Sequence, residues 1–99
     1  MESDVLTFYT FIEAHRVVRE WSKGDLATYG GFDRSLLSKL GNGTRRPTLD
    51  LAHKCASAFS RHPISSEKRK GLSQPDDADA WYAYLAVLVN EDFGERRSV

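Results

Sequence analysis

The chain has 99 residues, 40% of them hydrophobic, and its 14 basic and 14 acidic residues give a formal net charge of zero. This length allows one small domain and excludes a two-lobed enzyme, while the hydrophobic content excludes a disordered chain. The charges are unevenly distributed, since residues 16–70 carry twelve Lys and Arg against five acids and both ends are acidic. The basic middle is compatible with a phosphate-binding face and equally with a mixed, solvated surface.

The sequence carries no sign of export or membrane insertion. Its start, Met1 to Asp4, is acidic where a signal peptide is basic, and its longest apolar run, Ala80 to Val89, is about half a membrane span. The single cysteine, Cys55, cannot form an internal disulfide, which suits a reducing compartment. A cytoplasmic protein without membrane contact is therefore expected.

The first helix is expected to run from an N-cap at Ser3 to about Trp21. Phe8 and Ile12 lie at a helical spacing and predict its buried face, with His15 as a hydrogen-bonded residue of the core.

Two short helices should follow. Ser22 and Asp25 have the spacing of a capping box, and the helix they start should end at Gly30-Gly31, where one glycine takes a positive φ. Asp33 is the expected N-cap of a third helix from Arg34 to Leu40.

A fourth helix is expected from Leu49 to about Phe59, capped by Thr48. Its predicted buried face consists of Leu49, Ala52, Cys55, Ala56 and Phe59. After a polar linker over 61–74, a proline and two acids predict a last helix over 75–93 that stops at Gly94. The predicted organisation is a domain at 1–60, a linker at 61–74 and a C-terminal helix at 75–94.

The stretch from about Lys23 to Gly43 has the spacing of a helix-turn-helix. Ala27 supplies a small helix contact, and Gly31, four residues later, supplies the turn. Leu37 and Leu40 point inward, which leaves an outer face on the third helix that can enter a major groove. This face consists of Arg34, Ser35, Leu36, Ser38 and Lys39.

The segment from Ser22 to Phe59 resembles the Cro and phage-repressor (XRE) family of helix-turn-helix domains. The matching residues are Leu26-Ala27, Gly31 to Ser35, Leu37 to Leu40, Asn42-Gly43, Arg46 to Leu49 and Ala56 to Phe59. The resemblance implies an all-α, lambda-repressor-like bundle of four helices plus a C-terminal dimerisation helix. The chain departs from the family pattern at Gly24, Gly30 and Gly41, and Tyr29 or Phe32 is expected to cover Gly30.

The resemblance also implies the roles of individual residues in binding double-stranded DNA. The base-reading residues it implies are Arg34, Ser35, Leu36 and Lys39. The phosphate-binding residues it implies are Lys23, Ser38, Asn42, Thr44, Arg45 and Arg46. These side chains have suitable chemistry, because Arg donates two hydrogen bonds to guanine and Lys reaches the same acceptors or a phosphate. The implied function is a transcription regulator, in the simplest case a repressor, that binds a palindromic operator as a homodimer.

An apolar stripe on the last helix predicts a dimer interface made of Trp81, Tyr84, Leu85 and Leu88. The helix could instead fold back onto its own domain. Because its apolar residues lie on nearly every side, they exceed what one small core covers, and dimerisation is the expected outcome.

No enzyme is expected, because the chain has no phosphate-binding glycine loop, no nucleophile elbow and no evident carboxylate pair around a cleft. No cofactor or metal is expected either, since His53, Cys55 and His62 lack the spacing of zinc ligands. The alternative function is a protein-interaction regulator, such as an antiactivator or antitoxin, built on a degenerate helix-turn-helix.

Overall fold

Six helices make up the described part of the chain, which comprises residues 7–69, 72 and 74–97 of this computed structural model. They are α1 (Phe8–Val18), α2 (Lys23–Gly30), α3 (Ser35–Gly41), α4 (Leu49–Ser60), α5 (Ser66–Arg69) and α6 (Ala78–Arg97). No strand occurs among these residues, which confirms the all-α prediction. None of the described helices has both the length and the apolar character needed to cross a membrane.

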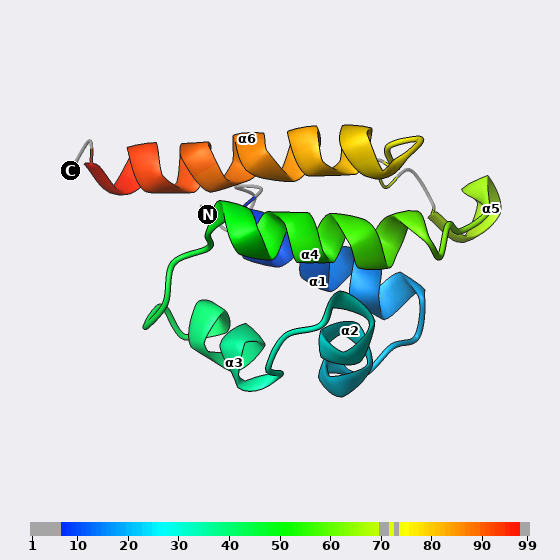
Figure 1. Cartoon of the computed structure of the whole chain (residues 1–99), viewed down its shortest axis with the longest axis horizontal. Coiled ribbons are helices and arrows are strands. Elements are labelled where there is room, and N and C mark those ends of the chain that lie inside the picture. Colours follow the sequence, from blue (N-terminus) through cyan, green and yellow to red (C-terminus); the bar gives the residue numbers. More distant parts are fainter. Residues whose placement is uncertain (1–6, 70–71, 73, 98–99) are drawn as a thin grey trace.

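Helix α4 lies at the centre of the molecule. Figure 1 shows α6 running antiparallel along one side of α4, while α2 and α3 lie on its other side. Helix α1 contacts both α6 and α3. The C-terminal helix is therefore remote from the outer surface of α2 and α3, which it leaves uncovered.

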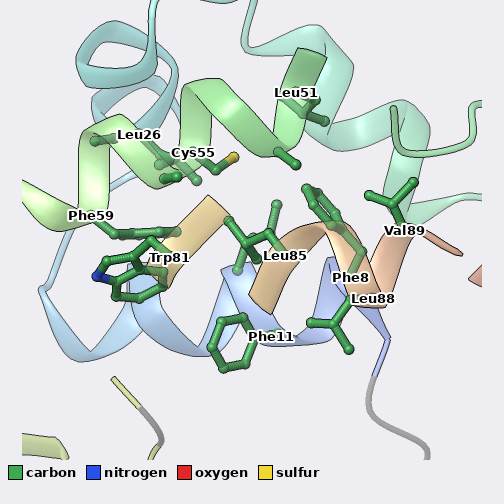
Figure 2. Close-up of a cluster of buried hydrophobic side chains, with 14 of the residues drawn as sticks. Phe8, Phe11, Leu26, Leu51, Cys55, Phe59, Trp81, Leu85, Leu88 and Val89 are labelled. Carbon is green, nitrogen blue, oxygen red and sulfur yellow. The ribbon is translucent and has the colours of Figure 1, made fainter. Parts of the chain in front are cut away.

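The core combines side chains from α1, α4 and α6 with a few from α2 and α3 (Figure 2). Its large members include Phe8, Phe11, Ile12, Leu26, Leu37, Leu51, Phe59, Trp81 and Leu85. The ring centres of Trp81 and Phe59 are 5.1 Å apart, and those of the stacked rings of Phe11 and Tyr84 are 4.8 Å apart. The aromatic residues of α6 thus contact α1 and α4 of the same chain.

The prediction of a separate dimerisation helix is therefore wrong for this apolar stripe. Trp81 is 1% exposed, Leu85 0% and Leu88 5%, and Tyr84 is half-buried against Phe11. The physical reason is a second face of α1, formed by Phe11 and His15, which would be exposed to solvent without α6. Helix α6 covers this face and belongs to the same core as the first four helices.

The ends of two helices differ from the prediction. Helix α1 begins after Thr7, whose hydroxyl accepts from the Thr10 N–H, whereas Ser3 lies outside the described residues. It ends at Val18, and Glu20 turns the chain with a positive φ of 62°. Helix α6 continues past Gly94, since a single glycine costs a helix only about 1 kcal/mol.

Local capping signals are confirmed in α2 and α4. Ser22 Oγ accepts from the Asp25 N–H at 3.0 Å, and Asp25 accepts in return from the Ser22 N–H at 2.8 Å. Thr48 caps α4 by accepting from the Leu51 N–H. The buried face of α4, however, includes Leu51 at 3% exposure in place of Leu49 at 46%. Residues 51, 55 and 59 follow steps of four along the helix, and Leu49 at its start lies off that row.

Two residues of the predicted linker, Ile64 and Gln74, are joined by a pair of hydrogen bonds. The Gln74 amide accepts from the Ile64 N–H and donates to the Ile64 carbonyl, both at 3.0 Å. The short helix α5 lies between these two residues in the sequence. Gln74, which precedes α6, is thus bound to Ile64, which follows α4.

Candidate nucleic-acid interface

A glycine turn sets the angle between α2 and α3. Gly31 ends α2 in the left-handed conformation with φ 81°, and the N–H groups of Gly31 and Phe32 both donate to the Ala27 carbonyl. Ala27 is 4% exposed. These observations confirm the predicted conformation of Gly31 and the predicted small contact at Ala27. Substitutions at Gly31 would strain the turn because an L side chain rarely adopts this φ.

Phe32 covers Gly30, as the sequence led us to expect. A Cβ atom at Gly30 would lie 2.6 Å from Phe32 Cε2 and 3.3 Å from the Lys54 carbonyl oxygen on α4. The glycine therefore lets an aromatic ring from the turn fill the space between α2 and α4.

Two glycine substitutions should differ in their effects on stability. Gly30→Ala should lower the free energy of unfolding by about 1–3 kcal/mol, because the Phe32 ring would have to move. Gly24→Ala should not, since its Cβ would meet only Ser22 Oγ at 3.6 Å and Arg34 Cδ at 4.0 Å. Urea unfolding of the two variants at one pH measures the difference, and equal midpoints would contradict the packing role of Gly30.

Helix α3 presents a polar face outward. Leu37 and Leu40 are buried, whereas the outward residues Ser35, Ser38 and Lys39 are exposed, as is Arg34 just before the helix. Leu36 differs from the prediction of a fully outward face, since it is half-buried and packs against the core. Only part of the Leu36 side chain is therefore accessible on the outer surface of α3.

The start of α3 is fixed by a carboxylate. Asp33 Oδ1 accepts from the Ser35 N–H at 3.0 Å, and this backbone hydrogen bond is the main cause that lowers the pKa of Asp33. The prediction of Asp33 as N-cap is wrong by one residue, because α3 begins at Ser35 and its N-cap is Arg34, which makes no side-chain capping hydrogen bond, while Asp33 binds the Ser35 N–H from the position before the cap. The charged carboxylate holds Ser35 and Arg34 in place at the beginning of the outer face.

A hollow of about 370 Å³ lies between the start of α2 and α3. It is lined by Lys23, Arg34, Ser35 and Ser38. A Cβ atom at Gly24 would lie 4.0 Å from Arg34 Cδ, so the Arg34 side chain lies beside the start of α2. Lys23 from the start of α2 and three residues at the start of α3, at least eleven positions later, therefore bring two cations and two hydroxyl groups together, which suits an anion.

A second hollow, of about 340 Å³, lies at the other end of α3. The residues that line it include Arg45, Asn42 and Gly43 from the loop after α3 and Thr7 and Tyr9 from the start of α1. Sequence reasoning missed Thr7 and Tyr9. The available signal was Gly41, because a Cβ there would lie 2.8 Å from the Tyr9 hydroxyl.

The loop after α3 is stabilised by two of its predicted phosphate-binding residues. Asn42 Oδ1 accepts from the Thr44 N–H at 3.1 Å and from its hydroxyl at 2.8 Å. The side chains of Asn42 and Thr44 therefore stabilise the loop conformation, in which Gly43 has a positive φ of 83°. Arg45 and Arg46 are exposed on it.

Comparison with protein-family models, with curated proteins and with solved structures finds no match to this chain. The resemblance to Cro-like proteins therefore stays a prediction from the residue pattern.

Within the described residues, no three His, Cys, Asp or Glu side chains are grouped so that they could hold a metal ion. Cys55 is buried, and desolvation raises the pKa of its thiol to about 12, so it behaves as a small core residue. His53 lies apart from it, exposed and in ring contact with Tyr82.

Proposed function

We propose that this chain is a sequence-specific DNA-binding transcription regulator of the Cro-like type, in which α2 and α3 form the helix-turn-helix. The observation that carries this proposal is the convergence of Lys23 and Arg34 with Ser35 and Ser38 around one hollow. A phosphate of the DNA backbone fits this combination of charge and hydrogen-bond donors.

The spacing of the two hollows supports binding across a major groove. Helix α3 has seven residues and is thus about 10 Å long, close to the groove width of about 12 Å. Each end of the helix carries a hollow with an arginine, Arg34 at one and Arg45 at the other. Phosphates on the two sides of the groove would meet these cations while α3 lies between them.

The proposal divides the outward residues by role. Ser35 and Lys39 lie on the exposed face of α3 and are the proposed base readers, with the edge of Leu36 beside them. Arg34 shares its hollow with Lys23, which favours a phosphate contact over the base contact that the sequence resemblance implies.

The proposed regulator acts as a homodimer through a surface other than the α6 stripe. An apolar groove of about 710 Å³ runs along α1 and is lined by residues that include Tyr9, Ala14, Val17, Val18 and Leu72. Val17 is 60% exposed. This groove is the proposed contact for a second copy, and occupancy of an operator by the dimer would block transcription.

The same groove favours one alternative function, a protein-interaction regulator. Its lining is largely apolar and lies on α1, away from the charged hollow between α2 and α3. A partner protein that covers α1 would leave the polar face of α3 without a role in binding.

Selection from a random library of double-stranded DNA tests the proposal. The full chain is expected to enrich a palindromic site, because two copies would place two α3 helices about 34 Å apart. Lys39→Ala should retain binding but lose preference at one base pair, at a cost of about 1–3 kcal/mol. The control is Lys54→Ala, since Lys54 pairs with Asp50 on α4, and it should enrich the same site. A library that shows no enrichment with the wild-type chain contradicts the proposal and favours the alternative.

A further inference from the structure

A half-buried arginine, Arg19, lies against the aromatic core just after the end of α1. The Arg19 guanidinium carbon is 4.8 Å from the centre of the Phe59 ring, 5.6 Å from Trp21 and 5.9 Å from Trp81. Burial lowers the pKa of Arg19 to about 10, so the side chain keeps its positive charge at neutral pH. This cation is part of the packing between α1, α4 and α6.

Arg19 donates its hydrogen bonds to neutral acceptors from three parts of the chain. Nε donates to the His62 carbonyl at 2.8 Å, and Nη2 donates to Gln74 Oε1 at 3.2 Å. Nη1 contacts His15 Nδ1 at 2.9 Å and the His15 carbonyl at 3.0 Å. Because Gln74 is tethered to Ile64, Arg19 connects the end of α1 to the segment that leads into α6.

The geometry requires the neutral form of His15. Arginine can only donate, so His15 Nδ1 must accept and cannot carry a proton. His15 is 0% exposed. The centre of its ring lies 4.7 Å from that of Phe11, 5.5 Å from that of Phe59 and 4.8 Å from that of Trp81. A proton on Nδ1 would remove the acceptor and place two cations in contact inside the core.

We propose that His15 and Arg19 form an acid-sensitive switch that controls the packing of α6. Protonation of His15 displaces the Arg19 guanidinium, breaks its hydrogen bond to Gln74 and frees the start of α6 from α1 and α4. The inference concerns the core and does not depend on DNA binding.

Among the described residues, the acceptors around the guanidinium are neutral ones that Arg19 already uses. On α1, Glu13 forms an ion pair with Arg16, with 2.7 Å between Glu13 Oε1 and Arg16 Nη2. Helix α4 presents the Phe59 ring, the Phe59 carbonyl, which accepts from Arg19 Nη2 at 3.5 Å, and the neutral thiol of Cys55. Helix α6 presents Trp81. The segments beside α4 and α6 contribute the His62 carbonyl and the Gln74 amide oxygen, which Arg19 already uses, while the His62 ring packs against Trp21 and Tyr29.

The sign of the effect follows from proton binding. A histidine in an open or unfolded chain takes up a proton with a pKa of about 6.5, whereas the closed core holds the neutral ring. Open states therefore bind one more proton below this pH, and the equilibrium constant for opening rises up to about tenfold per pH unit. Above about pH 7 neither state is protonated at this site and the effect vanishes.

Amide hydrogen exchange and urea unfolding between pH 7.5 and 5.0 test the switch. In the wild-type chain the opening constant for residues 78–85 should rise by at least about tenfold over this range. His15→Gln offers Arg19 a neutral oxygen and should abolish this rise. The matched control is His53→Gln, because His53 is exposed on α4 and should leave the rise unchanged. An equal rise in the His15→Gln chain overturns the proposal.

A measurement on the unaltered chain keeps the proposal testable if His15→Gln does not fold. An NMR pH titration should show the His15 ring staying neutral until the native signals of α6 disappear. A His15 ring that is protonated with α6 still protected from exchange overturns the proposal.

Discussion

A chain that ends at Arg69 will lose its helical structure, because α6 covers the core that α1 and α4 leave open. The truncation removes Trp81, Leu85 and Leu88, each at most 5% exposed. Loss of one such side chain costs about 2–5 kcal/mol, and a small domain is stable by only about 5–15 kcal/mol. Circular dichroism at 25 °C measures the loss. A chain that ends at Asn90 keeps all three side chains and should remain helical.

Single substitutions on α6 give the same test with less disruption. Leu85→Ala should lower the free energy of unfolding by about 2–5 kcal/mol, since Leu85 is 0% exposed. Val87→Ala is the control on the same helix, because Val87 is 53% exposed and should change stability by less than about 0.5 kcal/mol. A helical monomer from the chain ending at Arg69, or equal stability of the two α6 variants, would contradict the core role of α6.

Replacing Lys23 and Arg34 together by alanine should weaken binding to every DNA sequence. The two cations line one hollow, and each phosphate contact they make adds about one unit to the slope of log affinity against log salt. The double variant should therefore lose about two units of slope and, at 0.15 M salt, on the order of thirtyfold in affinity for specific and non-specific DNA alike. Fluorescence anisotropy across a salt series measures both quantities.

The control for this pair is Lys54→Ala, which removes one positive charge from α4 and should leave the slope unchanged. Circular dichroism establishes that the double variant is folded. A loss of affinity confined to the selected sequence, with the slope intact, would assign these residues to base reading. An unchanged affinity on all sequences would contradict the proposed interface.

Much of the local structure was predictable, because its causes lie within a few residues of each other in the sequence. The reciprocal cap of Ser22 and Asp25, the Thr48 cap and the left-handed Gly31 all depend on short-range hydrogen bonds or on steric limits of φ. Ala27, at one turn's distance from Gly31, belongs to the same pattern. These signals were sufficient to order the helices and to predict the outward side of α3.

The hollow between α2 and α3 was predictable only in part. The sequence indicated Lys23, Arg34 and Ser38 as separate members of two groups, one for phosphates and one for bases. Their convergence around one space depends on the turn at Gly31 and on the short distance from Gly24 to Arg34. Thr7 and Tyr9 enter the second hollow because α1 contacts α3, a tertiary contact that no local pattern encodes.

The sequence by itself determined the approximate positions of five of the six described helices, where several of them are capped and where the chain turns, whereas the short helix α5 lies within the predicted linker. Only the tertiary structure decided which apolar faces meet. The stripe of Trp81, Leu85 and Leu88 is equally suited to a second subunit or to its own domain, because hydrophobic burial has no direction. The choice depends on Phe11 and His15, about seventy residues earlier in the chain, whose uncovered face of α1 accepts α6 and encloses the charge of Arg19.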